Sequence, residues 1–196
     1  MDWILDQSIV LQLPVLFDQA ESPLYDIDLE LKRSFPYINF IPVLGDIRNR
    51  SRLEYTFSRF KPMIVFHAAA YKHVPMLELQ PWEAILNNIL GTRNLVRFAR
   101  AYAVERFVLV STDKAVRPTN IMGATKRVAE LMVLGQSSEK QAESQFIAVR
   151  FGNVVGSVGS VIPLFKKQIE QGGPVTVTHP EVTRYFMTIS EASQLI

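Results

Sequence analysis

The stretch that decides the fold is RFVLVSTDKAVRPTNIMGATKR, at residues 106–127. An apolar run with strand character is followed by Thr112, Asp113 and Lys114, and then by a helical segment that contains Lys126. Ligands of open α/β sheets bind at the carboxyl ends of the strands. This order therefore predicts catalytic groups placed beside a nicotinamide ring. A simple ion pair that caps a strand end is the alternative for Asp113 and Lys114.

Apolar runs alternate with longer segments of helical period along the rest of the chain, a pattern typical of crossover βαβ units. The predicted strands are 14–18, 38–43, 63–66, 106–111 and 146–151, and the predicted helices are 24–33, 51–60, 82–101, 121–135 and 161–170. In the segment 82–101, Ile85, Ile89, Val96 and Ala99 form one apolar stripe, so this helix should lie on the sheet. We expect an α/β fold with a doubly wound, mostly parallel, Rossmann-like sheet. One domain should occupy residues 1–196, with a substrate-binding segment starting at about residue 152.

Composition excludes several classes of protein. The 196 residues carry a net charge of +2 and no cysteine, so no thiolate metal site is possible. The three histidines show no ligand spacing, so no metal is expected, and mixed charges argue against a nucleic-acid partner. Apolar runs are shorter than the roughly 18 residues of a membrane span, and the first residues do not resemble a secretory signal. These features predict a cytoplasmic protein.

Several further positions are candidates for contacts with a dinucleotide. Asp18 ends a predicted strand, where a carboxylate would bind the ribose and repel a 2′-phosphate, so NAD is favoured and NADP stays open; a polar strand terminator is the alternative. Asp46 and the apolar Ile47 follow the next strand and are candidates to hold the adenine. Asn88 lies inside a helix, where an asparagine has little local reason to be. It either bridges two elements near the site or is an exposed helix residue.

The segment after the third predicted strand combines small and basic side chains. Ala68, Ala69 and Ala70 would let the main chain approach a bulky cofactor, although a tight helix-packing site has the same composition. Lys72 follows and would face a phosphate or the substrate, or remain a solvated loop charge. In the carboxyl third, Asn153 and Arg184 are candidates for the substrate's diphosphate. Arg184 would otherwise brace a structural carboxylate.

Together these segments carry a family resemblance. The chain resembles the extended short-chain dehydrogenase/reductases, and among them the capsular polysaccharide biosynthesis group of UDP-N-acetylglucosamine 4,6-dehydratases. The motifs are FDQAE (17–21), GDIRN (45–49), HAAAYKHVP (67–75), NNILGTRN (87–94), STDKAVRPTNIMGATKR (111–127), RFGNVVGSVGSVIPLF (150–165) and TRYFMTISEA (183–192). The resemblance implies an NAD-dependent dehydratase of UDP-amino sugars, and we expect a homo-oligomer. Relatives may be tethered to the inner face of the membrane by a region outside this chain.

The resemblance also implies roles for the residues at the centre. Asp113 would take the proton of the sugar's C4 hydroxyl, Lys114 would remove the C5 hydrogen, and Thr112 would bond the C4 oxygen. Lys126 would hold the nicotinamide ribose. Most of the superfamily has a tyrosine where this chain has Met122, which cannot titrate. The long-chain branch shares that methionine.

A second departure concerns the beginning of the chain. Residues 1–13 contain no glycine, so the sequence predicts that the first strand and its glycine-rich loop are missing, and that the chain stops before the sugar-binding segment is complete. Three functions stay open: a dehydratase or its core, an epimerase or reductase on the same scaffold, and a catalytically inactive fragment.

Overall fold

The computed structural model describes residues 13–136, 144–156, 161–177, 179–181 and 183–196. The described residues divide into two compact units, one within residues 13–149 and the other within residues 150–196. The division at Arg150 lies close to residue 152, where the sequence analysis placed the start of a substrate-binding segment.

Parallel strand pairs form the centre of the larger unit. One pair and one three-stranded sheet are present, in the orders β1-β2 and β3-β4-β5, and the β1–β2 and β3–β4 pairs are parallel. Helices connect the strands of each parallel pair, which confirms the predicted α/β fold. The bounds are β1 Val15–Asp18, β2 Ile41–Leu44, β3 Ile64–His67, β4 Arg106–Thr112 and β5 Gln145–Phe151.

Within the described ranges, no strand joins the β1–β2 pair to the three-stranded sheet. A first strand and its glycine-rich loop were expected to be missing ahead of β1. That expectation falls on residues 1–12, which lie outside the described residues.

The predicted helices of this unit are present, one of them is divided, and the short helix α4 (Val74–Leu79) was not predicted. The segment expected as one helix is divided into α5 (Pro81–Ala84), a π-helix η1 (Ile85–Gly91) and α6 (Thr92–Ala101). A Cβ atom at Gly91 would lie 2.5 Å from the Cδ1 atom of Ile47, so this turn packs against another part of the chain. The other helices of this unit are α2 (Glu21–Ser34), α3 (Arg50–Phe60), α4 (Val74–Leu79), a 3-10 turn η2 (Asp113–Ala115) and α7 (Ile121–Gly135).

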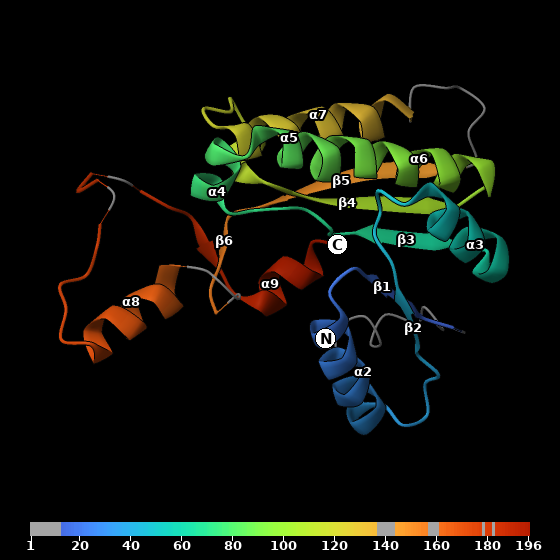
Figure 1. Cartoon of the computed structure of the whole chain (residues 1–196), viewed down its shortest axis with the longest axis horizontal. Coiled ribbons are helices and arrows are strands. Elements are labelled where there is room, and N and C mark those ends of the chain that lie inside the picture. Colours follow the sequence, from blue (N-terminus) through green and yellow to red (C-terminus); the bar gives the residue numbers. More distant parts are fainter. Residues whose placement is uncertain (1–12, 137–143, 157–160, 178, 182) are drawn as a thin grey trace. The chain divides into compact units, whose positions relative to one another are not determined.

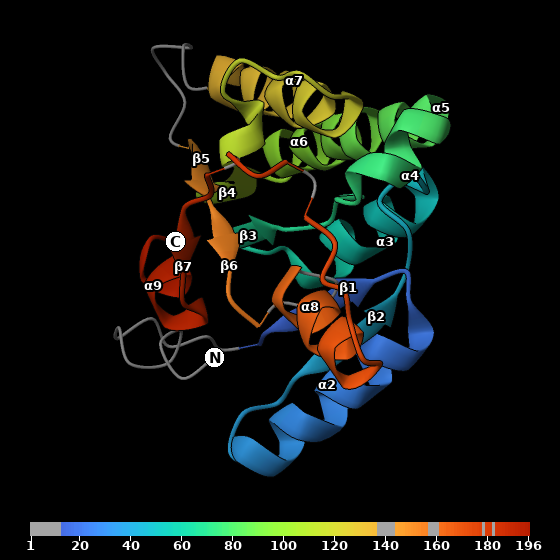
Figure 2. The same ribbon diagram turned by 90° about the vertical axis from the view of Figure 1, so that its left-hand side faces the viewer.

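Two long helical segments cover one face of the three-stranded sheet. Figures 1 and 2 both show α6 and α7 side by side over β4 and β5. Val96 and Ala99 of the predicted stripe are buried, whereas Ile85 and Ile89 are half-buried. Beneath them Phe107 stacks on Phe146 with ring centroids 5.5 Å apart. This apolar core fixes α7 over the carboxyl half of β4.

The smaller unit contains short elements. Strand β6 (Asn153–Val154) pairs in parallel with β7 (Phe186–Met187), and two helices are present, α8 (Val161–Glu170) and α9 (Ile189–Gln194). The bounds of α8 are those predicted from the sequence. In the part of the chain that the structure describes, no helix has both the length and the apolar character needed to cross a membrane.

Candidate functional site

The acid and amine predicted from the sequence meet at the carboxyl end of β4. The Lys114 Nζ atom donates to Asp113 Oδ1 at 3.0 Å, and the Thr112 hydroxyl donates to the same oxygen at 3.0 Å. The Asp113 and Lys114 side chains are 33% and 29% exposed, so the pair is neither buried in packing nor fully solvated. A partly open carboxylate next to an amine can exchange protons with a bound molecule.

Competing effects set the charge of Asp113. Burial raises the pKa of its carboxyl group, but hydrogen bonds from Lys114 and Thr112 and the positive charge of Lys114 outweigh this effect. The pKa of Asp113 therefore lies below its ordinary value. At neutral pH the group is a carboxylate and can accept a proton.

Helix α7 begins directly against this pair. The Asn120 side chain accepts a hydrogen bond from the main-chain N–H of Gly123 at 2.8 Å, which caps the helix. A Cβ atom at Gly123 would collide with the carbonyl oxygen of Lys114. Glycine at this position thus allows α7 to pack on the turn that carries Asp113 and Lys114.

Lys126 lies one turn further along α7 and is buried, at 6% exposure. Its Nζ atom donates to the carbonyl oxygen of Val110 in β4 at 2.6 Å. Burial lowers the pKa of Lys126 to about 8, although the negative charge of Glu130 acts in the opposite direction. Lys126 thus titrates close to neutral pH.

Met122 occupies the position where most relatives of the resembled superfamily have a tyrosine. Its side chain is 4% exposed and packs in an apolar cluster with Leu77 and Ala84. A thioether has no proton to transfer, and this packing also leaves it almost no accessible surface. Proton exchange at this site must therefore depend on other groups.

The loop after β3 holds the three alanines and is tied to the helices by Asn88. Ala68 and Ala69 are exposed, Ala70 is half-buried and Lys72 is exposed. Asn88 is 1% exposed and bonds both the N–H and the carbonyl oxygen of Tyr71, at 2.9 and 3.1 Å. It also donates to the Thr125 hydroxyl of α7 at 3.1 Å. The bridging interpretation of Asn88 is confirmed, and the exposed alternative is wrong.

The remaining bonding capacity of Asn88 is also used inside the protein. Its Oδ1 atom accepts a bond from Asn87 at 3.1 Å in addition to the bond from Tyr71. Two acceptor bonds and two donor bonds saturate an amide side chain. Asn88 therefore fixes the loop after β3, and a direct bond from its side chain to a cofactor would require one of these bonds to break.

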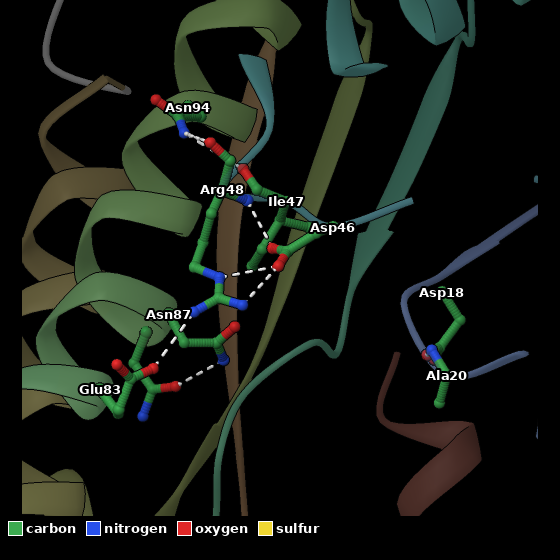
Figure 3. Close-up of polar contacts among 9 residues, drawn as sticks. Asp18, Ala20, Asp46, Ile47, Arg48, Glu83, Asn87 and Asn94 are labelled. Atoms are coloured by element: carbon green, nitrogen blue, oxygen red, sulfur yellow. Dashed lines mark hydrogen bonds and ion pairs between the residues drawn. The ribbon is translucent and has the colours of Figure 1, made fainter. Parts of the chain in front are cut away.

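The acidic residues at the ends of β1 and β2 occupy different environments (Figure 3). Asp18 is exposed, and its Oδ1 atom accepts a bond from Ala20 N at 2.8 Å at the start of α2. Asp46 forms a 2.6 Å ion pair with Arg48, which also reaches Glu83 at 3.2 Å. Burial raises the pKa of Asp46, but the hydrogen bonds and charge of Arg48 lower it by more.

Ile47, the apolar partner expected beside the adenine, belongs to the core. It is 6% exposed, and its carbonyl oxygen accepts a bond from Asn94 at 3.1 Å. Its side chain fills the space left by Gly91 and has little surface for an adenine ring. Contact between Ile47 and a cofactor stays a prediction, and the exposed Asp18 is better placed for one.

The two candidates of the smaller unit have local main-chain contacts. Asn153 is half-buried, and its N–H donates to the carbonyl oxygen of Tyr185 at 2.8 Å. Arg184 is exposed and donates to the carbonyl oxygen of Thr183 at 2.9 Å. Gly152 is required here, because a Cβ atom would lie 2.7 Å from the Tyr185 oxygen. Phosphate binding by Asn153 and Arg184 stays a prediction.

Sequence reasoning missed a set of buried polar side chains around Lys126. His67 and Glu130 are 2% and 1% exposed, and Glu130 accepts hydrogen bonds from Ser111 at 2.6 Å and Arg127 at 2.9 Å. The position of Glu130, four residues after Lys126 on the same helix, was the available signal. A hollow of about 350 Å³ lies elsewhere, between α3 and α6, and is lined by Arg50, Ser51, Glu54, Arg97 and Phe98.

Comparisons with known proteins show which sequences and structures the chain resembles. The chain is 56% identical over 183 residues to the capsular polysaccharide biosynthesis protein CapD of Staphylococcus aureus, a match that covers 93% of this chain and 30% of CapD. It is 38% identical over 170 residues to the UDP-glucose 4-epimerase of Rickettsia canadensis, covering 86% of this chain and 49% of the epimerase.

Solved structures share the fold. Pen from Bacillus thuringiensis is 38% identical with a TM-score of 0.84, covering 94% of this chain and 57% of Pen. DesIV, a dTDP-glucose 4,6-dehydratase from Streptomyces venezuelae solved with NAD, is 18% identical with a TM-score of 0.80, covering 99% of this chain and 65% of DesIV. The chain thus spans about a third to a half of the curated relatives described above. The family model described as polysaccharide biosynthesis protein matches residues 4–196, and the chain belongs to this family.

Proposed function

We propose that the chain is the catalytic core of an NAD-dependent nucleotide-sugar 4,6-dehydratase that acts on a UDP-amino sugar. The observation that carries this proposal is the partly exposed Asp113–Lys114 pair at the end of β4, against which Gly123 allows α7 and Lys126 to pack. A proton acceptor and an amine on adjacent residues suit a reaction that moves protons at neighbouring carbons. Membership of a polysaccharide biosynthesis family supports a sugar substrate.

The residues at the strand ends fit a dinucleotide. Asp18 presents an exposed carboxylate after β1, and Ala68 and Ala69 are small and exposed after β3. Lys126 leaves two of its three N–H groups without a partner among the described residues. We infer that Asp18 would bond the adenosine ribose and that Lys126 would bond the nicotinamide ribose. The small side chains of the alanines would let the main chain approach the cofactor.

The chain's own groups would then move protons. Asp113 takes the proton of the C4 hydroxyl while Thr112 bonds the same oxygen. The redox chemistry would come from bound NAD, through removal of hydride from C4 and its return at C6. The C4 ketone makes the C5 hydrogen acidic, and Lys114, after its ammonium group has lost a proton to solvent, removes this hydrogen. Protonated Asp113 gives its proton to the C6 oxygen, which leaves as water, and Lys114 returns a proton to C5.

Incubation of the chain with NAD and UDP-N-acetylglucosamine tests this proposal. We expect a product lighter by one water, with deuterium from heavy water incorporated at C5. Lys114→Ala should abolish loss of water. Lys61→Ala serves as a matched control because Lys61 is an exposed lysine at the end of α3 with no proposed role toward cofactor, substrate or proton, and this variant should still lose water. Water loss by Lys114→Ala at the parental rate would contradict the assignment.

A nucleotide-sugar 4-epimerase is the second candidate, because the chain is 38% identical to UDP-glucose 4-epimerases. Its product would have the mass of the substrate and a changed configuration at C4. Failure to bind NAD, measured by calorimetry, would instead support the inactive fragment. The incubation and the calorimetric measurement together therefore separate the three functions.

A further inference from the structure

A hydrogen-bond chain fixes the tautomer of the buried His67. The Thr92 hydroxyl donates its only proton to the carbonyl oxygen of Asn88 at 2.7 Å. The Nε2 atom of His67 lies 2.8 Å from that same hydroxyl oxygen. Because the hydroxyl proton is already used, the oxygen must accept from Nε2–H. The Nδ1 atom of His67 is therefore an unprotonated acceptor.

Nδ1 of His67 is also buried, and none of the described residues bonds to it. A buried acceptor without a partner is costly, so such an atom points to a group not yet assigned to it. Burial, with a second contribution from the charge of Lys126, lowers the pKa of His67 to about 3. The ring is thus neutral at the pH at which the protein would work.

The Lys126 ammonium group belongs to helix α7 and is bonded to β4, the strand next to β3. Its bonded partner, the Val110 carbonyl, belongs to the residue after Leu109, and Leu109 is paired with His67 in the β3–β4 register. Two of its N–H groups are unused among the described residues. The acceptor on β3 and the Lys126 donors bonded to the neighbouring strand β4 are both buried, and polar groups of this kind are commonly joined by an ordered water.

We propose that His67 is a positioning residue for Lys126, and that its Nδ1 atom accepts a hydrogen bond from a water molecule which in turn accepts from the Lys126 ammonium. Thr92 serves this arrangement because it holds the ring in the required tautomer. The arrangement helps to hold the ammonium in its charged form at the end of β4. Any contribution of this arrangement to catalysis rests on the proposed bond between Lys126 and the nicotinamide ribose.

Other charged groups around α7 have separate partners or are exposed. Glu130 lies on α7 itself and interacts with Lys126, Ser111 and Arg127. On the elements packed against α7, the charged groups are Asp113 and Lys114 in their mutual ion pair, Glu78 bonded to Ile121 N, Glu83 paired with Arg48, and the exposed Arg93, Arg97, Arg100 and Arg106. These charged groups leave Nδ1 of His67 as a neutral buried acceptor without a partner among the described residues.

Nuclear magnetic resonance of the parent chain tests the tautomer without any substitution. With 15N-labelled histidine, we expect His67 to show a protonated Nε2 and an unprotonated Nδ1, and to stay neutral at about pH 5, where an unperturbed histidine is charged. His67→Phe identifies the signals. A protonated Nδ1 in the parent would overturn the proposal.

Titration of the Lys126 13Cε signal tests whether His67 raises the pKa of Lys126. The pKa of Lys126 should fall by about one pH unit in His67→Phe and in Thr92→Val, because a hydrogen bond to the charged form is lost. Thr92→Ser should restore the parental value. Thr56→Val is the matched control, since Thr56 is a buried helical threonine whose hydroxyl also donates four residues back, to Arg52 O at 2.8 Å.

An unchanged pKa of Lys126 in folded His67→Phe and Thr92→Val would overturn the proposal. These signals need neither NAD nor a sugar nucleotide. If the parent chain has no dehydratase activity but the variants show the expected shifts in the Lys126 pKa, the proposed function is rejected and the role of His67 stands.

Discussion

At the scale of single residues, burial and charge oppose each other at Lys126. Its ammonium group is 6% exposed and bonded to a main-chain carbonyl, and Glu130 lies one turn away on the same helix. Asp113, in contrast, is one third exposed and carries a lowered pKa. The two groups are suited to different tasks, since Asp113 can exchange protons with a ligand whereas Lys126 supplies a positive charge below about pH 8.

The charge of Lys126 should make NAD binding depend on pH. Its pKa of about 8 means that the charged form dominates below that pH and is lost as the pH rises through it. If this charge holds the ribose, affinity for NAD should fall about tenfold between pH 7 and pH 9. Calorimetric titrations at the two values check the prediction. Lys126→Arg stays charged and should lose this dependence, so an equal fall in that variant would contradict the assignment.

Two glycines in helices should respond in opposite directions to alanine. At Gly91 a Cβ atom would lie 2.5 Å from Ile47, whereas at Gly135 nothing lies within 4 Å. Gly91→Ala should therefore lower the free energy of unfolding by about 1–3 kcal/mol through overpacking. Gly135→Ala should raise it by about 0.5–1 kcal/mol, because alanine loses less backbone entropy in a helix. Urea denaturation measures both, and stabilisation by both substitutions would refute the close contact at Gly91.

At the scale of elements, Asn88 connects the loop after β3 to helix α7. It lies in the π-helix η1. π-helices are rare in proteins, and those that occur are often found at functional sites. The Asn88 side chain bonds the main chain of Tyr71 and the hydroxyl of Thr125. Loop and helix are the two segments proposed to contact NAD, so this one amide sets the spacing between them.

Asn88→Ala should lower the free energy of unfolding by about 2–4 kcal/mol, because several buried polar groups lose their partner at once. Asn49→Ala provides the comparison. Asn49 caps α3 through one bond to Arg52 N at 3.0 Å, and its loss should cost about 1 kcal/mol. Denaturation curves of the two variants decide the matter. If Asn88→Ala lowers the free energy of unfolding by no more than Asn49→Ala does, the hydrogen bonds of Asn88 contribute little to stability.

At the scale of the whole molecule, one surface of α7 is suited to self-association. Val128, Leu131 and Leu134 are 39%, 56% and 43% exposed and follow one another at helical spacing. Exposed apolar patches of this kind mark protein interfaces. We expect this surface to join two copies of the chain in the predicted homo-oligomer.

Leu131→Lys should shift the chain toward the monomer in sedimentation velocity, since a charge in an apolar interface is unfavourable. Leu29→Lys on α2 is the control, because Leu29 is 49% exposed and lies on a different helix. That variant should keep the parental mass. A monomeric parent, or an unchanged mass for the Leu131 variant, would refute the expected interface.

The order of the main elements and the polar residues at the strand ends could be predicted, because both depend on spacing along the sequence. Helices α7 and α8 have the predicted bounds, and Asp113 and Lys114 lie at the end of β4 as expected. The pairing of β6 with β7 was not predicted. Each of these strands has two residues and no periodicity, and their partners are more than thirty positions apart in the chain.

The amino-acid sequence by itself determined an alternating α/β chain with an acid and an amine after its fourth strand, because hydrophobic period and nearest neighbours require no knowledge of distant contacts. Only the tertiary structure decided that Ile47 fills the space at Gly91, that Met122 packs among apolar side chains, and that His67 bonds Thr92. Each of these facts depends on residues from different elements meeting in a close-packed interior, where position in the fold determines what a side chain contacts.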